Sequence, residues 1–131
     1  METSDRKIIL DSSVWVAFLH DTDSQHKEAL EVFERIGHTI TVPEYVVIEV
    51  ATILKRRKKL DEAKRFVHRV LNENPQSFLP ADSLIYETAA LFRERTDQLS
   101  FTDTTLLVLA RSYRVITFDR DLQKAIERGG A

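Results

Sequence analysis

The chain has 131 residues and a formal net charge of −2, from 19 Lys and Arg against 21 Asp and Glu. This length suits a single domain with one core, which we expect to span residues 1–131. A hydrophobic content of 43% and a charged content of 31% are typical of a folded globular protein and exclude a disordered chain. The absence of cysteine excludes disulfides, thiolate metal sites and cysteine nucleophiles. Because the N-terminus has no apolar segment and no apolar run reaches roughly 18 residues, we expect a cytoplasmic protein with no signal peptide and no membrane span.

The first half of the chain alternates between short β-branched runs and longer amphipathic runs. Gly37 marks the end of one amphipathic run, and Pro43 is favourable at the first position of a helix. In chain order, we predict a strand over 7–10, a helix over 12–19 (with continuation of the strand as the alternative), a helix over 24–36, a strand over 39–42, and a helix that starts at Pro43 and ends in the basic run 55–59.

The second half continues the same alternation. We predict a helix from Asp61, a loop over 72–75, a weak strand over 76–79 and a helix capped by Asp82. A further helix begins near Asp103 with Ser100 or Thr102 as its cap, followed by a strand over 115–118 and a short helix from Asp121 to 128. Strands that alternate with helices indicate an α/β fold with a parallel sheet and helices on both of its faces.

Three acidic residues stand alone inside long apolar runs. Asp11 is the only charge in 8–19, Glu49 the only charge in 45–54, and Asp103 the only charge in 99–110. Such runs are usually buried, and a buried carboxylate needs a cation, a metal or a proton. Asp11 and Asp119 follow predicted strands, and ligands of parallel sheets bind at the C-terminal strand ends. We therefore expect these four acids to meet at one edge of the sheet and to hold a divalent metal ion.

Each acid also has a simpler interpretation. Asp11 could cap the following helix, Asp103 could stabilise a helix dipole, and Asp119 could belong to an ordinary turn. Glu49 lies in mid-helix, where capping does not apply, so its alternatives are an exposed position or a buried pair with an arginine such as Arg93 or Arg111. All four simple interpretations would have to hold together.

Four segments of the chain form a recognisable set: 9–14 (ILDSSV), 42–44 (VPE) with Glu49, 99–103 (LSFTD) and 116–122 (ITFDRDL). Their order and approximate spacing give the chain a resemblance to the PIN-domain ribonucleases, and most closely to the toxin-type (VapC-like) members of toxin–antitoxin pairs. This resemblance implies a PIN-like three-layer sandwich with a short parallel sheet of four to five strands. It also implies metal-dependent cleavage of RNA, a homodimer and a cognate antitoxin of a type II system. The chain departs from the family in having no convincing strand after Asp121.

The chemistry of the acids agrees with this resemblance. Hard oxygen ligands suit Mg²⁺ or Mn²⁺, and such an ion lowers the pKa of a bound water that can hydrolyse a phosphodiester. We predict that Asp11, Asp103 and Asp119 bind the metal directly, while Glu49 binds a second ion or orients the water. The hydroxyls of Ser12 and Thr117 and the carboxylate of Asp121 would orient these ligands without binding the metal directly. Water as the nucleophile predicts 5′-phosphate and 3′-hydroxyl products.

Contacts with the RNA substrate are predicted at three cations. Arg120 lies beside the proposed site, and Lys55 and Arg56 begin the basic run 55–59. The alternative for that run is that its cations complement the C-terminal dipole of a helix and remain solvated. Setting aside the four acids changes the net charge from −2 to +2, which is compatible with a phosphate backbone.

Two other functions compete with the nuclease. A receiver-like phosphotransfer domain would need adjacent acids at one strand end and a Lys after a later strand, but Ser12 follows Asp11 and Asp119 occupies the place of the Lys. A non-catalytic PIN-fold module that binds RNA is the other alternative, although nothing in the sequence indicates loss of the acids.

Overall fold

The sheet of this protein has four parallel strands. A computed structural model describes residues 6–37 and 39–129, and within these the strands are β1 (Ile8–Leu10), β2 (Ile40–Pro43), β3 (Phe78–Leu79) and β4 (Arg114–Ile116). They lie in the order β3-β2-β1-β4, and every pairing is parallel. The predicted α/β architecture with a short parallel sheet is therefore confirmed.

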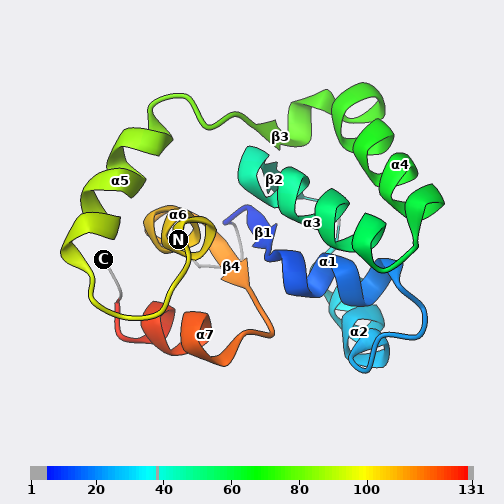
Figure 1. Cartoon of the computed structure of the whole chain (residues 1–131), viewed down its shortest axis with the longest axis horizontal. Helices are drawn as coiled ribbons and strands as arrows, with labels where there is room; N and C mark the ends of the chain where they lie inside the picture. Colours follow the sequence, from blue (N-terminus) through cyan, green and yellow to red (C-terminus); the bar gives the residue numbers. More distant parts are fainter. Residues whose placement is uncertain (1–5, 38, 130–131) are drawn as a thin grey trace.

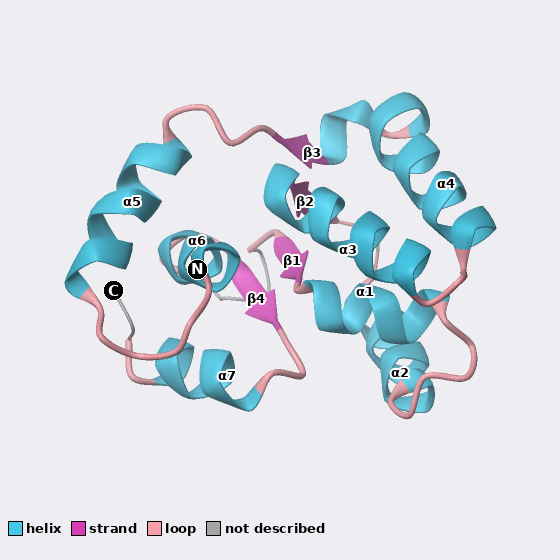
Figure 2. Ribbon diagram, in the orientation of Figure 1, coloured by secondary structure: helices cyan, strands magenta, loops and turns pink. Residues whose placement is uncertain are grey.

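Helices surround the sheet, as Figures 1 and 2 show. β1, in the middle of the sheet, directs Ile9 into one apolar cluster and Ile8 and Leu10 into another, as the alternation of side chains along a strand requires. None of the described helices is long and apolar enough to cross a bilayer. The helices are α1 (Ser12–Leu19), α2 (His26–Ile36), α3 (Glu44–Arg56), α4 (Leu60–His68), α5 (Leu84–Glu94), α6 (Phe101–Leu109) and α7 (Arg120–Glu127), with a π-helical turn (Arg69–Glu73) and a 3₁₀ turn (Pro75–Ser77) after α4.

Two helix starts and one strand end differ from the prediction. Pro43 is the last residue of β2 and the N-cap of α3 in extended conformation, not the first helical residue. α7 is capped by Asp119 and not by Asp121, because the Asp119 carboxylate accepts a hydrogen bond from the Leu122 amide. β4 ends at Ile116, two residues before the predicted end of this strand.

Three further helices also start at positions that differ from the prediction. α2 begins at His26, after a turn in which the Asp23 carboxylate accepts from the Gln25 amide. α4 begins at Leu60, so Asp61 lies in its first turn. α5 follows Ser83, since Asp82 has a φ of 23° and is not its cap. Ser100, one of the two predicted caps of α6, is the one found.

Candidate active site

The C-terminal ends of β1 and β4 lie side by side. Leu10 is in register with Ile116, and the amide of Asp11 donates a 2.9 Å hydrogen bond to the carbonyl of Ile116. Both strands stop there, so Asp11 and Thr117 become neighbours although 106 residues separate them. The sheet edge predicted to hold the site is therefore formed by these two strand ends.

Asp11 is the hub of a hydrogen-bond network at this edge. Its side chain is buried, with 3% exposure, and caps α1 by accepting from the Ser12 amide at 2.6 Å. Its second oxygen accepts from the Thr117 hydroxyl at 2.6 Å and from the Ser13 hydroxyl at 3.0 Å. These donors fix the orientation of the carboxylate. They supply no cation, so a buried negative charge is left without an ionic partner among the described residues.

Ser13 is a site residue that the sequence reasoning missed. Its hydroxyl donates to Asp11 and accepts from the amide of Phe118 at 3.1 Å, which ties α1 to the segment after β4. Thr117 bridges in a similar way, since its hydroxyl accepts from the Asp119 amide at 2.9 Å and donates to Asp11. The two consecutive serines after Asp11 could have identified Ser13 from the sequence, but only Ser12 was predicted to support the site.

Glu49 reaches the same network from α3. The hydroxyl of Ser12 donates to the Glu49 carboxylate at 2.5 Å. Burial raises the pKa of Glu49, the Ser12 hydrogen bond partly offsets this, and the nearby charge of Asp11 raises the pKa further. The alternatives for Glu49 do not hold, because it is half-buried and no arginine among the described residues forms an ion pair with it.

Asp103 approaches from the first turn of α6. It forms a capping box with Ser100, in which the Ser100 hydroxyl accepts from the Asp103 amide at 3.0 Å and the Asp103 carboxylate accepts from the Ser100 amide at 3.3 Å. Burial raises the pKa of Asp103 to about 6, helped by the charges of Asp11 and Asp119 and opposed by hydrogen bonds from Ser100. Asp11 and Asp119 are therefore close enough to Asp103 for their charges to raise its pKa.

The simpler interpretations of three of the acids hold in the structure. Asp11, Asp103 and Asp119 all stabilise helix N-termini, as the simpler readings supposed. The same residues nevertheless converge, with Glu49, on one edge of the sheet. Capping accounts for their positions along the helices, but it does not account for their convergence.

The donor set suits a hard divalent cation. Asp11, Glu49, Asp103 and Asp119 offer oxygen ligands, which favour Mg²⁺ or Mn²⁺ over softer metals. In residues 6–37 and 39–129, no three Asp, Glu or His side chains are yet positioned to coordinate one ion. Asp103 and Asp119 direct one carboxylate oxygen each to a backbone amide, so coordination requires these side chains to turn.

The remaining predicted residues lie at the margin. Arg120 and Asp121 are exposed in the first turn of α7, directly after Asp119. Asp121 makes no hydrogen bond or ion pair with the described residues. Lys55 and Arg56 are exposed in the last turn of α3, beyond Glu49.

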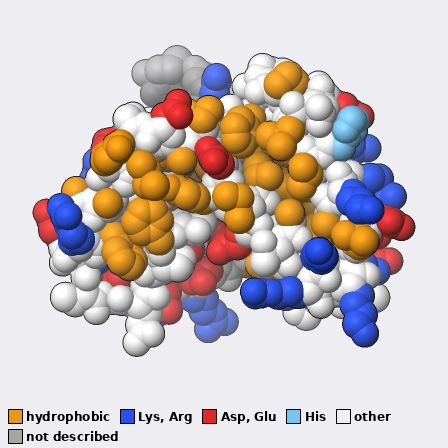
Figure 3. All heavy atoms as spheres, turned by 45° about the horizontal axis from the view of Figure 1, so that its top comes forward, with side chains coloured by type: hydrophobic (Ala, Val, Ile, Leu, Met, Phe, Trp, Pro, Cys, Tyr) orange, Lys and Arg blue, Asp and Glu red, His pale blue; other side chains and the backbone are white. Residues whose placement is uncertain are grey.

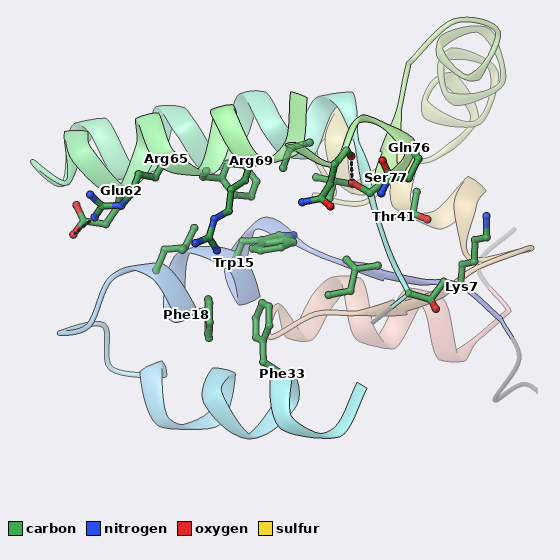
Figure 4. A pocket seen from close by; sticks show the side chains of 17 residues that line it. Lys7, Trp15, Phe18, Phe33, Thr41, Glu62, Arg65, Arg69, Gln76 and Ser77 are labelled. Atoms are coloured by element: carbon green, nitrogen blue, oxygen red, sulfur yellow. Dashed lines mark hydrogen bonds and ion pairs between the residues drawn. The ribbon is translucent and has the colours of Figure 1, made fainter. Parts of the chain in front are cut away.

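One cavity lies away from the carboxylates. It has a volume of about 650 Å³ and lies between α1, α2, β2 and α4 (Figure 4). Trp15, Phe18 and Phe33 form its aromatic wall, with Phe18 and Phe33 stacked at 3.8 Å between ring centroids. Arg65 and Arg69 stand on its opposite side. None of the four acids lines it, so we place the chemistry at the sheet edge and not in this cavity.

Comparison with known proteins agrees with this architecture. The profile of the PIN domain matches residues 8–127, nearly the whole chain. The chain belongs to the PIN domain family. Among solved structures, this PIN domain is similar to Mycobacterium tuberculosis VapC20, described as a Sarcin-Ricin loop cleaving toxin, with a TM-score of 0.75 and 23% identity over 91% of this chain and 95% of that one. At this identity the likeness describes the fold. No curated protein gives a significant match.

Proposed function

We propose that this PIN domain is an endoribonuclease that hydrolyses phosphodiester bonds with a metal-activated water. The proposal is supported by the approach of Asp11, Glu49, Asp103 and Asp119 to one sheet edge, where no cation among the described residues forms an ion pair with any of them. Carboxylates that raise the pKa values of their neighbours are destabilising by themselves. Such a set is expected where a divalent cation completes it.

The residues divide into ligands and orienting groups. Asp11, Asp103 and Asp119 would hold Mg²⁺ or Mn²⁺, with Glu49 at a second ion or at the water. When bound, the ion would neutralise the phosphate and lower the pKa of a water. Thr117 and Ser13 hold the Asp11 carboxylate in place, and Ser12 holds Glu49. Other residues proposed to act at this site are Asp121 near the metal and Arg120, Lys55 and Arg56 on the phosphate backbone.

The first experiment is cleavage of RNA by the purified protein with Mg²⁺, with Mn²⁺ and with EDTA. The wild type should leave 5′-phosphate and 3′-hydroxyl ends in both metals and be inactive in EDTA. Asp11→Asn should reduce the rate by at least about 100-fold, since even residues behind metal ligands contribute about 10–100-fold. The circular dichroism spectrum should be unchanged.

Glu28→Gln is the matched control, because Glu28 is an exposed acid in the first turn of α2. It should cleave at the rate of the wild type. Wild-type rates for Asp11→Asn would refute the site. RNA binding without cleavage by the metal-loaded wild type would favour the non-catalytic alternative.

The toxin part of the proposal rests on the fold shared with VapC20. A toxin of this kind needs a protein that inhibits it. The 650 Å³ cavity offers an apolar binding site whose lining includes Arg65 and Arg69. An acidic, amphipathic segment of an antitoxin would fit it. The protein encoded by the adjacent reading frame should co-purify with the chain and inhibit cleavage, and Phe33→Asp should release it. Stable binding of that protein to Phe33→Asp would exclude this cavity as its binding site.

A homodimer is proposed through the outer faces of α3 and α5. Val46, Val47 and Val50 of α3 are buried in the core and are not available as contact residues. The large hydrophobic side chains exposed on these two helices are instead Ile48, Ile85, Tyr86 and Phe92, at 56%, 41%, 78% and 43% exposure. Light scattering should give a dimer for the wild type and a monomer for Tyr86→Glu. A monomeric wild type would refute the proposal.

A further inference from the structure

Positive charge is concentrated in one short stretch of the chain. Residues 55–69 contain eight Lys and Arg and two acids, a net charge of +6 in a chain whose total is −2. The stretch covers the end of α3 and the whole of α4. Figure 3 shows Lys and Arg side chains gathered on that side of the molecule. The small net charge of the chain therefore hides an uneven distribution of charge over its surface.

Ion pairing divides these cations into two groups. Arg57 pairs with Asp23 at 2.7 Å, Lys59 with Asp21 at 3.4 Å, and both tie the end of α3 to the connection between α1 and α2. Arg65 and Arg69 pair with acids on their own or the next turn. The second group forms no ion pair with the described residues and consists of Lys55, Arg56, Lys58 and Lys64.

Two members of the second group line one groove. α3 and α4 pack together, and between them lies an open groove of about 370 Å³. Its lining is mostly apolar and includes Ala51, Ala63 and Val67. Lys55 from α3 and Lys64 from α4 also line it.

We propose that this groove binds the phosphate backbone of RNA outside the cleavage site. The inference rests on the proposed nuclease function and gives it a second contact surface. Arg56 connects the two places, because it lies seven residues after Glu49 and therefore on the same face of α3, about 10 Å along the axis. An RNA strand that leaves the carboxylates along this face of α3 reaches Arg56, and the neighbouring Lys55 lines the groove together with Lys64.

A purely structural role does not explain these lysines. Cations in the last turn of a helix complement its dipole, which would account for Lys55. Lys64 lies in the middle of α4, where that effect is absent, and it has no acidic partner among the described residues. Two lysines that form no ion pair with the described residues and line the same open groove, within the stretch 55–69 of net charge +6, match a polyanion.

The test separates binding from cleavage. Lys55→Gln/Lys64→Gln is made in the Asp11→Asn background, and affinity for a single-stranded RNA of about 20 nucleotides is measured in EDTA at several salt concentrations. Each lost phosphate contact lowers the slope of log K against log salt by about 0.7, so the double variant should lower it by about 1.4. Its Kd at low salt should rise about tenfold or more.

Lys27→Gln/Arg35→Gln is the matched control. It removes the same charge from exposed positions of α2 that form no ion pair with the described residues. It should leave the slope nearly unchanged. Equal slopes for the two double variants would overturn the proposal, as would equal losses of affinity for RNA and for poly-glutamate, which would indicate a surface for an acidic protein.

Cleavage assays distinguish this proposal from the nuclease proposal. With Asp11 intact, Lys64→Gln alone should raise KM for the long RNA and leave kcat/KM for a dinucleotide substrate unchanged, because Lys64 lines the groove and is not among the residues proposed at the cleavage site. A wild type that cleaves no RNA would refute the nuclease function, while the binding result in EDTA would stand. An unchanged KM for the long RNA in an active enzyme would refute the groove alone.

Discussion

Asp103 is expected to destabilise the metal-free fold at neutral pH. Its pKa is raised from 3.8 to about 6, chiefly by burial and by the charge of Asp11. Between these two values the folded state binds more protons than the unfolded state, so stability falls as the pH rises through about 6. Two pKa units correspond to about 3 kcal/mol, and partial exposure to water reduces this to about 1–2 kcal/mol.

Asp103→Asn removes this penalty while keeping an oxygen that can accept from the Ser100 amide. The variant should therefore be more stable than the wild type by about 1–2 kcal/mol at pH 8 in EDTA, which is several degrees in Tm for a chain of this size. The two proteins should become nearly equal in stability at pH 4 and converge fully below it, as the wild-type carboxyl becomes protonated in the unfolded state as well as in the folded state. Urea or thermal unfolding at pH 4, 6 and 8 measures the difference.

Bound metal should reverse the order of stability of the wild type and Asp103→Asn. Mg²⁺ or Mn²⁺ that binds only the folded state stabilises it in proportion to the logarithm of its concentration over Kd, and the wild type should gain more than Asp103→Asn. Glu127→Gln, an exposed acid in α7, is the control and should follow the wild type throughout. A less stable Asp103→Asn protein at pH 8 in EDTA would contradict the reasoning, because it would mean that the capping interaction outweighs repulsion among the carboxylates.

Two other predictions concern hydroxyl groups. Thr117→Val removes a 2.6 Å hydrogen bond to Asp11 and should lower kcat by about 10–100-fold with little change in KM, whereas Thr117→Ser should remain close to the wild type; an equally active valine variant would exclude an orienting role. The buried hydroxyls of Thr105 and Thr88 bond each other at 3.1 Å between α6 and α5. Thr105→Val should cost about 1–3 kcal/mol of unfolding free energy by leaving Thr88 unpaired, and the double valine variant should recover part of it. A double variant less stable than the single one would contradict this account.

The sheet was predictable because each strand carries a local signal. β1 and β2 are short runs of β-branched and apolar residues between polar breaks, and both appear in the predicted places. Cap positions were less predictable, because several acids and hydroxyls near each helix start compete for the same amides. Asp119 caps α7 in preference to Asp121 since Thr117 bonds the Asp119 amide and turns the chain out of the strand one step earlier. That contact depends on Asp11, more than a hundred residues away, and no local window contains it.

The candidate site was predictable for a different reason. Asp11, Glu49 and Asp103 are each the only charge in an apolar segment. A charge in a segment that is expected to be buried can be recognised from the sequence alone. The orienting groups are not anomalous, since serine and threonine are ordinary at helix starts. Ser13 is therefore distinguishable from Ser12 only once the three-dimensional path of the segment after β4 places the Phe118 amide against it.

Capping explains how four carboxylates coexist at one edge before a cation arrives. Asp103 gives one oxygen to the Ser100 amide and Asp119 gives one to the Leu122 amide, and neither of their other oxygens accepts a hydrogen bond from the described residues. The positive ends of α6 and α7 thus offset part of the repulsion from Asp11. A metal ion can engage the second oxygens through small side-chain rotations, without replacing the backbone donors. The bond to Ser100 would then strengthen the metal site and not compete with it, which requires Ser100→Ala to weaken metal affinity and α6 stability together.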